Sequence, residues 1–227
     1  MFDIRSLLIV MVATNTVLAI ALWIGNGRRL QGGLAQWTIA LSAQAAAFAL
    51  FAGRGLVPDW ASLVAGNGLL GVSLSFMAAA IVAFRAGALP AVVHVACGAT
   101  AAFAAGALLH TEDARIILVN LLFAAGQVAL LALAWKPVEG VGAGARGLFL
   151  ASFVLGAASL LSRAAVRLAW PDSGDAFLAP SIIHAIGLMI AYTAVLLSSV
   201  SFLLMQKDRA DFLAGQLASL DPLTGFF

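Results

Sequence analysis

Charged residues are scarce in this sequence, and their scarcity excludes most classes of soluble protein. Only 12 basic and 10 acidic residues occur among 227, whereas 63% of the residues are apolar. A soluble domain is roughly 25% charged and roughly 45–50% apolar. The mean hydropathy of +1.06 points the same way. We therefore expect a membrane protein, not a cytosolic enzyme, a secreted disulfide scaffold or a disordered tail.

Cysteine and lysine are almost absent, which excludes further functions. The single cysteine, Cys97, lies deep in an apolar run, so we expect neither an intrachain disulfide nor a metal site. The only lysines, Lys136 and Lys207, lie at the ends of apolar runs, whereas a retinal pigment needs a lysine in mid-membrane. The basic residues are dispersed and the net charge is only +2, so we expect no binding to nucleic acid.

Long apolar runs dominate the sequence instead. About 20 apolar residues in a helix cross the hydrocarbon core of a bilayer. Short segments rich in Gly, Pro and Asp separate the runs, and such short loops make neighbouring spans antiparallel. We predict an all-α membrane protein in which residues 1–205 form a domain of seven transmembrane helices. The seven runs are 6–24, 34–52, 60–84, 90–109, 115–134, 147–170 and 181–205.

Small residues recur at helical spacing in the third and fourth runs. They form two stripes, Gly71, Ser75 and Ala79 on the third run and Gly98, Ala102 and Gly106 on the fourth. Small residues let helix backbones approach closely in a membrane. The segment 66–71 also fits the dinucleotide-binding pattern G-x-G-x-x-G, but that motif needs a strand before it. We therefore interpret the glycines as helix-packing residues.

The distribution of basic residues predicts the orientation of the chain. With the C-terminus in the cytoplasm, seven of the Lys and Arg residues lie on the cytoplasmic side and five on the outer side. Cytoplasmic loops of membrane proteins carry the excess of basic residues. Trp60 and Trp170 then lie at the outer interface, and Trp23 and Trp135 lie at the inner one. We expect the N-terminus outside and the C-terminus inside.

The last apolar run continues into an amphipathic segment, 206–220. Apolar residues follow one another at alternating spacings of three and four, which is the seam of a parallel coiled coil. We predict that this segment is a helical linker that pairs two copies of the chain. A helix lying on the membrane surface is the alternative. The seam consists of Leu203, Gln206, Ala210, Leu213, Leu217 and Leu220.

A short motif follows the linker at residues 221–227. Asp221, Leu223, Thr224 and Gly225 match the pattern Asp-x-Leu-Thr-Gly, with Pro222 at the variable position. Proline disfavours helical geometry at the residue before it, so the linker helix is expected to end near Leu220. The motif resembles the opening of a GGDEF-type diguanylate cyclase domain.

The resemblance implies a function for the whole chain. Residues 221–227 then begin a truncated catalytic domain, and the seven-span region is similar to membrane sensors of bacterial cyclases. The resemblance also implies a homodimer in the bacterial inner membrane, because the family joins two GTP molecules between two catalytic domains. The GGDEF signature and the sites for GTP and Mg²⁺ do not occur in these 227 residues. We therefore expect no catalytic residue and no enzyme activity in this fragment, whose junction residues are not catalytic.

Polar side chains inside apolar runs are costly in a membrane and are therefore candidates for function. We predict a pocket in the outer half of the bundle that binds a small anionic or lipid-like ligand. Each candidate also has a structural alternative: snorkelling, a salt bridge to a loop acid, helix packing or a solvated turn. The candidate residues are Asn67, His110, Asn120, Arg163, Arg167 and His184.

Two other functions remain open from the sequence. A haem-b electron carrier would use His110 and His184 as axial ligands, although we expect no cofactor. A small transporter would need paired polar groups or broken helices near the midplane. That region is nearly bare apart from Asn15 and Gln44. The sensory function is therefore the preferred interpretation.

The predicted orientation is tested with reporter fusions. A reporter active only in the cytoplasm is expected to be active after Phe227 and silent within 171–180, because seven spans place these points on opposite sides. Reporter activity normalised to fusion-protein level is the measurement. The reverse pattern would overturn the orientation.

Overall fold

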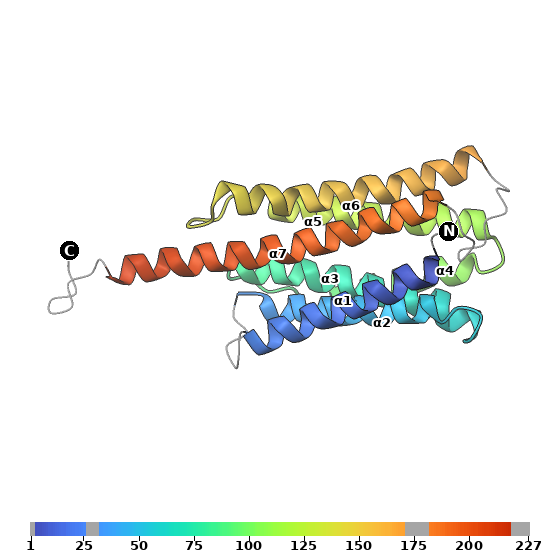
Figure 1. The fold of residues 1–227 in the computed structure, drawn as a ribbon, viewed down its shortest axis with the longest axis horizontal. Coiled ribbons are helices and arrows are strands. Elements are labelled where there is room, and N and C mark those ends of the chain that lie inside the picture. The colour runs from blue at the N-terminus through green and yellow to red at the C-terminus, as the bar shows by residue number, and fades with distance from the viewer. Residues whose placement is uncertain (1–2, 26–31, 171–181, 219–227) are drawn as a thin grey trace.

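The chain is a helical bundle in which helices that follow one another in the sequence run antiparallel (Figure 1). The computed structural model describes residues 3–25, 32–170 and 182–218, and within these ranges it contains no strand. The elements are α1 (Ile4–Gly25), α2 (Leu34–Ala52), the π-helical turn η1 (Trp60–Ala65), α3 (Gly66–Phe84), α4 (Ala91–Ala107), α5 (Glu112–Ala134), α6 (Ala143–Ala169) and α7 (Ile182–Ala218).

Six of these helical segments are long and apolar enough to cross a membrane. They comprise α1, α2, η1 with α3, α5, α6 and α7, whereas α4 is apolar but has only 17 residues. Each of the seven predicted runs therefore corresponds to one helical segment. This confirms an all-helical, multi-pass membrane protein. α6 begins at Ala143, four residues before the predicted run, because three of the four residues there, Ala143, Ala145 and Arg146, favour a helix.

The helices form a ring of six with α4 outside it. In order around the ring, α1 packs on α2, α2 on α3, α3 on α5, α5 on α6, α6 on α7, and α7 returns to α1. Within the described residues, α4 touches only α3, α5 and η1. The ring therefore has an interior that α4 does not reach.

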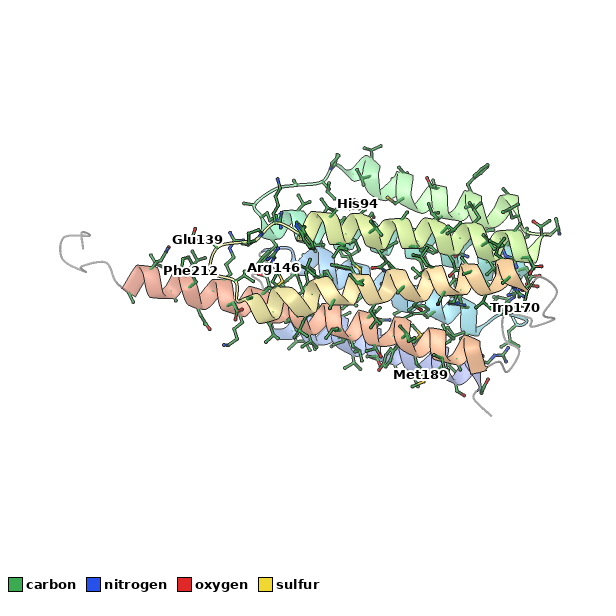
Figure 2. All side chains as sticks on the ribbon, turned by 90° about the horizontal axis from the view of Figure 1, so that it is seen from above. His94, Glu139, Arg146, Trp170, Met189 and Phe212 are labelled. Atoms are coloured by element: carbon green, nitrogen blue, oxygen red, sulfur yellow. The ribbon has the colours of Figure 1, made fainter. Side chains whose placement is uncertain are left out.

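The two ends of the bundle differ in character. At one end α7 extends well beyond the other helices, and the C-terminus lies there (Figure 1). We call this the linker end and the opposite end, where α1 begins, the arginine end. Arg146 near one end of α6 and Trp170 just beyond the other mark the two ends in Figure 2.

An aromatic cluster closes the ring in the half nearer the linker end. The Trp37 ring of α2 stacks on Phe202 of α7 at a centroid distance of 4.6 Å and tilts against Phe149 of α6 at 5.8 Å. Trp37 Nε1 also donates a hydrogen bond to Ser199 Oγ, 3.2 Å away. These rings are almost wholly buried. They connect α7 to α2 and α6 in this half of the ring.

Asp3 caps the first helix at the arginine end. Its carboxylate accepts hydrogen bonds from Ser6 Oγ at 2.7 Å and from the backbone N–H groups of Arg5 and Ser6. These bonds, the Ser6 hydroxyl first among them, lower the pKa of Asp3. The cap is therefore complete above the usual pKa of an aspartate and is lost as the pH falls through the lowered value.

Glycines allow α3 and α4 to pack in close contact, as the two stripes of small residues predicted. A Cβ atom at Gly71 would lie 2.5 Å from the carbonyl oxygen of Cys97, and one at Gly98 would lie 2.7 Å from the Val72 side chain. On the same contact, His94 Nδ1 lies 2.9 Å from Ser75 Oγ. The glycines hold α4 against the outside of the ring.

Replacing Gly71 is expected to separate α4 from α3. Gly71→Ala places a methyl group against the Cys97 carbonyl, and such overpacking costs about 1–3 kcal/mol. Gly147→Ala on α6 is the matched control, because no atom lies within 4 Å of the added Cβ. Thermal unfolding of the purified protein is expected to show a lower midpoint for the first variant only. Equal midpoints would contradict the close contact.

Candidate functional site

The ring encloses a cavity of about 200 Å³. All six helices of the ring contribute lining residues, for example Met11 of α1, Gln44 of α2, Met77 of α3, Phe123 of α5 and Leu188 of α7. α4 contributes none of the described lining residues. The cavity therefore lies along the axis of the ring.

Charged groups gather where the cavity meets the arginine end. Arg54, Glu112, Arg115 and Arg163 all line it there. Arg115 Nη1 donates hydrogen bonds to the carbonyl oxygens of Leu108, at 3.4 Å, and Leu109, at 2.6 Å. Its Nη2 atom lies 3.9 Å from Glu112 Oε1. The guanidinium group of Arg115 is thus held by the turn that precedes α5.

Arg54 also has a protein partner. Its Nε atom lies 4.0 Å from Asp59 Oδ1 in the segment that joins α2 to η1. The backbone carbonyl of Arg54 accepts a hydrogen bond of 2.9 Å from Arg5 Nη2. These contacts place Arg54 at the rim of the cavity.

Arg163 differs from the other arginines that line the cavity. Its aliphatic part packs on Gly187 of α7, where an added Cβ would lie 3.3 Å from Arg163 Cδ. Its Nε atom is buried and has no hydrogen-bond partner, and no other described residue pairs with its guanidinium group. Ser159, one turn earlier, donates a hydrogen bond of 3.1 Å to the Gly187 carbonyl. Arg163 therefore places an unpaired cation at the contact between α6 and α7.

Arg167 does not line the cavity, although the sequence groups it with Arg163. Its Nε atom lies 3.1 Å from Asp113 Oδ1, in the first turn of α5. A step of four residues advances a helix by about 6 Å and turns it by about 40° past a full turn. Arg167 therefore meets α5 beyond the cavity. The sequence also offers Asp172 and Asp175, in the loop after α6, as acidic partners for Arg163 and Arg167, but both lie outside the described residues.

Both candidate asparagines line the cavity. Asn67 Nδ2 donates to the carbonyl of Leu63 at 2.6 Å, and Asn120 Nδ2 donates to that of Ile116 at 2.7 Å. Each amide is thus anchored to a carbonyl four residues earlier in the chain. They contribute polar walls to the cavity without bonding to each other.

Only one of the two candidate histidines, His110, has a described side chain, and it is not among the residues that line the cavity. His110 is exposed in the turn after α4. The side chain of His184 lies outside the described residues. His94 lies between α3 and α4, where it stacks on Phe76 at a centroid distance of 4.0 Å (Figure 2). The described residues contain no group of three or more potential metal ligands.

Sequence reasoning missed several polar residues of the cavity. Gln44 is buried, its Oε1 atom has no hydrogen-bond partner, and its Nε2 atom lies 4.0 Å from Met77 Sδ. Gln127, Ser152 and Ser198 also line the cavity. These residues had a detectable signal as polar positions inside apolar runs. Their common orientation depends on helix rotation, which hydropathy does not reveal.

At the linker end, loops of the bundle hold α7 where it leaves the ring. Gln206 Nε2 donates a hydrogen bond to the carbonyl of Gly32, before α2. Arg209 Nη1 donates to the carbonyl of Phe84, the last residue of α3, and its guanidinium carbon lies 5.1 Å from the centre of the Phe84 ring. The loop before α2 and the C-terminal end of α3 thus contact one turn of α7.

The loop between α5 and α6 contacts the next turn of the same helix. Asp208 Oδ2 accepts a hydrogen bond of 3.0 Å from the Gly142 backbone N–H. The Phe212 side chain lies against Gly140, where an added Cβ would be 2.6 Å from the ring (Figure 2). We call Gln206, Asp208, Arg209 and Phe212, with the loops they contact, the collar.

The predicted coiled-coil seam is exposed on the single chain. Leu203 is 38% exposed, Leu213 is 49% exposed and Leu217 is 71% exposed, and Ala210 is exposed as well. Gln206 is the exception, because it bonds to the bundle. Leu220 and the junction, Asp221 to Gly225, lie outside the described residues.

The Arg167–Asp113 pair is expected to stabilise the bundle. In a double-mutant cycle with Arg167→Gln and Asp113→Asn, we expect a coupling of about 1 kcal/mol, because the arginine is only 8% exposed. The exposed pair Lys207–Asp211 is the control and is expected to give about 0.3–0.5 kcal/mol. Thermal unfolding provides the measurement. Equal, near-zero couplings would contradict a structural role for Arg167.

Comparison with known proteins adds no relative. No protein-family model matches the chain, and no curated protein or solved structure matches it. The function is therefore argued from the cavity, the collar and the motif at residues 221–225.

Proposed function

We propose that this chain is a membrane sensory module that controls a C-terminal diguanylate cyclase domain through a dimeric helical linker. One observation carries the proposal: α7 is a single helix from Ile182 to Ala218 that both lines the cavity and leaves the bundle. The motif that resembles the opening of a GGDEF-type domain begins three residues after α7 ends.

The geometry supports a mechanism in which ligand binding moves α7. Arg163 lies on Gly187, so a group that binds the guanidinium changes the contact between α6 and α7. From Gly187 to Ala218 the helix spans about 46 Å, at 1.5 Å per residue. A helix of that length carries a shift or rotation from the cavity to the linker.

The collar limits which movements of α7 are possible. It joins α7 to the loop before α2, to the last residue of α3 and to the loop before α6. A ligand alters the balance between two positions of α7 only if it binds one of them more tightly. In the proposed mechanism, the collar contacts are made in one position and weakened in the other.

The proposal includes an orientation, an environment and a partner. The arginine end faces outward and the linker end faces the cytoplasm, which agrees with the basic residues counted in the sequence. The chain resides in the bacterial inner membrane and pairs with a second copy through the exposed seam of Leu203, Ala210, Leu213 and Leu217. GTP and Mg²⁺ bind only in the catalytic domain that follows.

Cysteine cross-linking tests the dimeric linker. Leu213→Cys and Leu217→Cys are expected to cross-link between subunits several times faster than Asp211→Cys and Gln216→Cys, because only the first pair faces the partner in a parallel coil. All four positions are exposed on the single chain, so exposure does not separate them. Oxidation in native membranes followed by non-reducing electrophoresis measures the rates. Uniform rates would instead indicate a helix lying on the membrane surface.

Insertions in the linker test its control of the cyclase. One residue added after Gly215 turns the following helix by about 100°, whereas seven residues restore the phase to within about 20°. In the full-length protein, the single insertion is expected to change cellular cyclic di-GMP severalfold, and the seven-residue insertion is expected to preserve the response. A Cβ added at Gly215 would have no neighbour within 4 Å, and the insertion point follows the collar, so the insertions are expected to leave the contacts of the bundle in place. Identical outputs from the two would refute control by helix phase.

A further inference from the structure

We infer that the cavity binds a single-chain amphiphile, with an anionic carboxylate or phosphate group at Arg163 and an apolar chain extending toward the linker end. The inference deepens the proposed function by naming the chemical class of the signal. Binding itself is a property of the 227-residue chain and is measured without the cyclase domain.

The charges at the arginine end favour an anion. Three guanidinium groups and one carboxylate line the cavity there, so its formal net charge is +2. Arg54 and Arg115 each have an acidic partner, at 4.0 and 3.9 Å. Arg163 has none among the described residues, and its Nε atom is buried without a hydrogen bond. Arg163 is partly buried, and a partly buried charge within a membrane bundle is costly unless a counter-ion compensates it.

The planar guanidinium group of Arg163 suits an oxygen anion. It presents parallel N–H donors that bind two oxygens of a carboxylate or phosphate at once. Glu112 is the only acid that lines the cavity among the described residues, and it lies 3.9 Å from Arg115 Nη2. The repulsion it exerts on an incoming anion is therefore partly compensated by Arg115.

The rest of the cavity suits an apolar chain. Toward the linker end its walls are mainly apolar, with contributions from several helices. Only amides and hydroxyls interrupt these walls, at Gln44, Gln127, Ser152 and Ser198. An inorganic anion would leave this part empty. The apolar residues are Leu70, Leu74, Met77, Phe123, Phe153, Ala194 and Val195.

The dimensions of the cavity indicate that it holds one acyl chain. Arg163 and Ser152 line opposite ends of the α6 wall, eleven residues apart, which is about 16 Å along the helix. The cavity volume of about 200 Å³ is therefore spread along a length of about 16 Å, so the cavity is long and narrow. This shape suits one extended acyl chain better than a planar macrocycle or a pair of acyl chains.

The apolar chain of the ligand would lie directly on α7. Leu188, Ala191, Ala194 and Val195 of α7 line the cavity, and α6 faces them with Phe153, Gly156 and Leu160. An amphiphile that fills the cavity therefore contacts the helix that continues into the linker. This contact connects the inferred ligand to the proposed mechanism.

Recognition of the ligand's anionic group by Arg163 is tested with the purified 227-residue protein in nanodiscs of zwitterionic phosphatidylcholine. Dodecanoate is expected to raise the thermal unfolding midpoint, because a ligand that binds only the folded state stabilises it, whereas dodecanol is expected to have little effect. Arg163→Gln is expected to weaken dodecanoate binding about ten- to a hundredfold. Arg167→Gln, the matched control on the same helix, is expected to keep wild-type affinity, since Arg167 pairs with Asp113.

The binding of the ligand's acyl chain is tested with Ala194→Leu. Ala194 lies on the cavity wall about 10 Å below Gly187 along α7. Filling the cavity there is expected to weaken dodecanoate severalfold and to leave the shorter hexanoate unchanged. Arg163→Gln is expected to weaken both, so the two variants separate the binding of the charged group from that of the chain.

A third arm identifies the source of the anionic group. Lysophosphatidylglycerol replaces dodecanoate in the same assay: a larger stabilisation than that by dodecanoate assigns a lipid headgroup, and a smaller one assigns a free fatty acid. The inference is overturned if neither compound stabilises the wild-type chain, or if Arg163→Gln and Arg167→Gln bind equally well. Failure of the linker insertions to alter cyclic di-GMP would reject the sensory function and leave a positive binding result unaffected.

Discussion

In a membrane, polar groups that are not exposed to water must find partners inside the protein, and the arrangement at the arginine end follows from this constraint. Arg115 is held by two backbone carbonyls and Glu112, and Arg167 is held by Asp113. These bonds join the turn before α5 to the end of α6. Arg163 is surrounded by the same helices and lacks such a partner among the described residues. Among the described residues at the rim of the cavity, Arg54 and Arg115 thus have acidic partners and Arg163 has none.

The other half of the ring follows a different rule. There the interior is filled by Trp37, Phe149 and Phe202, whose rings contact one another across three helices. The filled half and the hollow half share α7. In the proposed mechanism, a change in the hollow half reaches the linker through this helix, which passes the aromatic cluster and then the collar. The collar bonds to backbone groups of the loop before α2, of the last residue of α3 and of the loop before α6.

Hydropathy predicted the helices well because a span of apolar residues has few alternatives in lipid. The small residues Gly71 and Gly98 also had a readable spacing, and the structure places both at the contact between α3 and α4. The candidate site was predicted less completely. Asn67, Asn120 and Arg163 line the cavity, whereas Arg167 and His110 do not. Gln44 and Arg115 were missed because depth along a helix was visible in the sequence and rotation about its axis was not. Arg54 was missed because it lies in the loop after α2.

The sequence by itself determined the solvent, the number of helical segments and the extension of the last helix, since each depends on local composition and periodicity. Only the tertiary structure decided that α4 lies outside a ring of six, that this ring is hollow at one end, and that Arg167 has an acidic partner whereas Arg163 has none among the described residues. Arg163 and Arg167 show the reason. They are the same residue type one turn apart, and the difference between them arises from Asp113 and Gly187, which the fold brings to them from other helices.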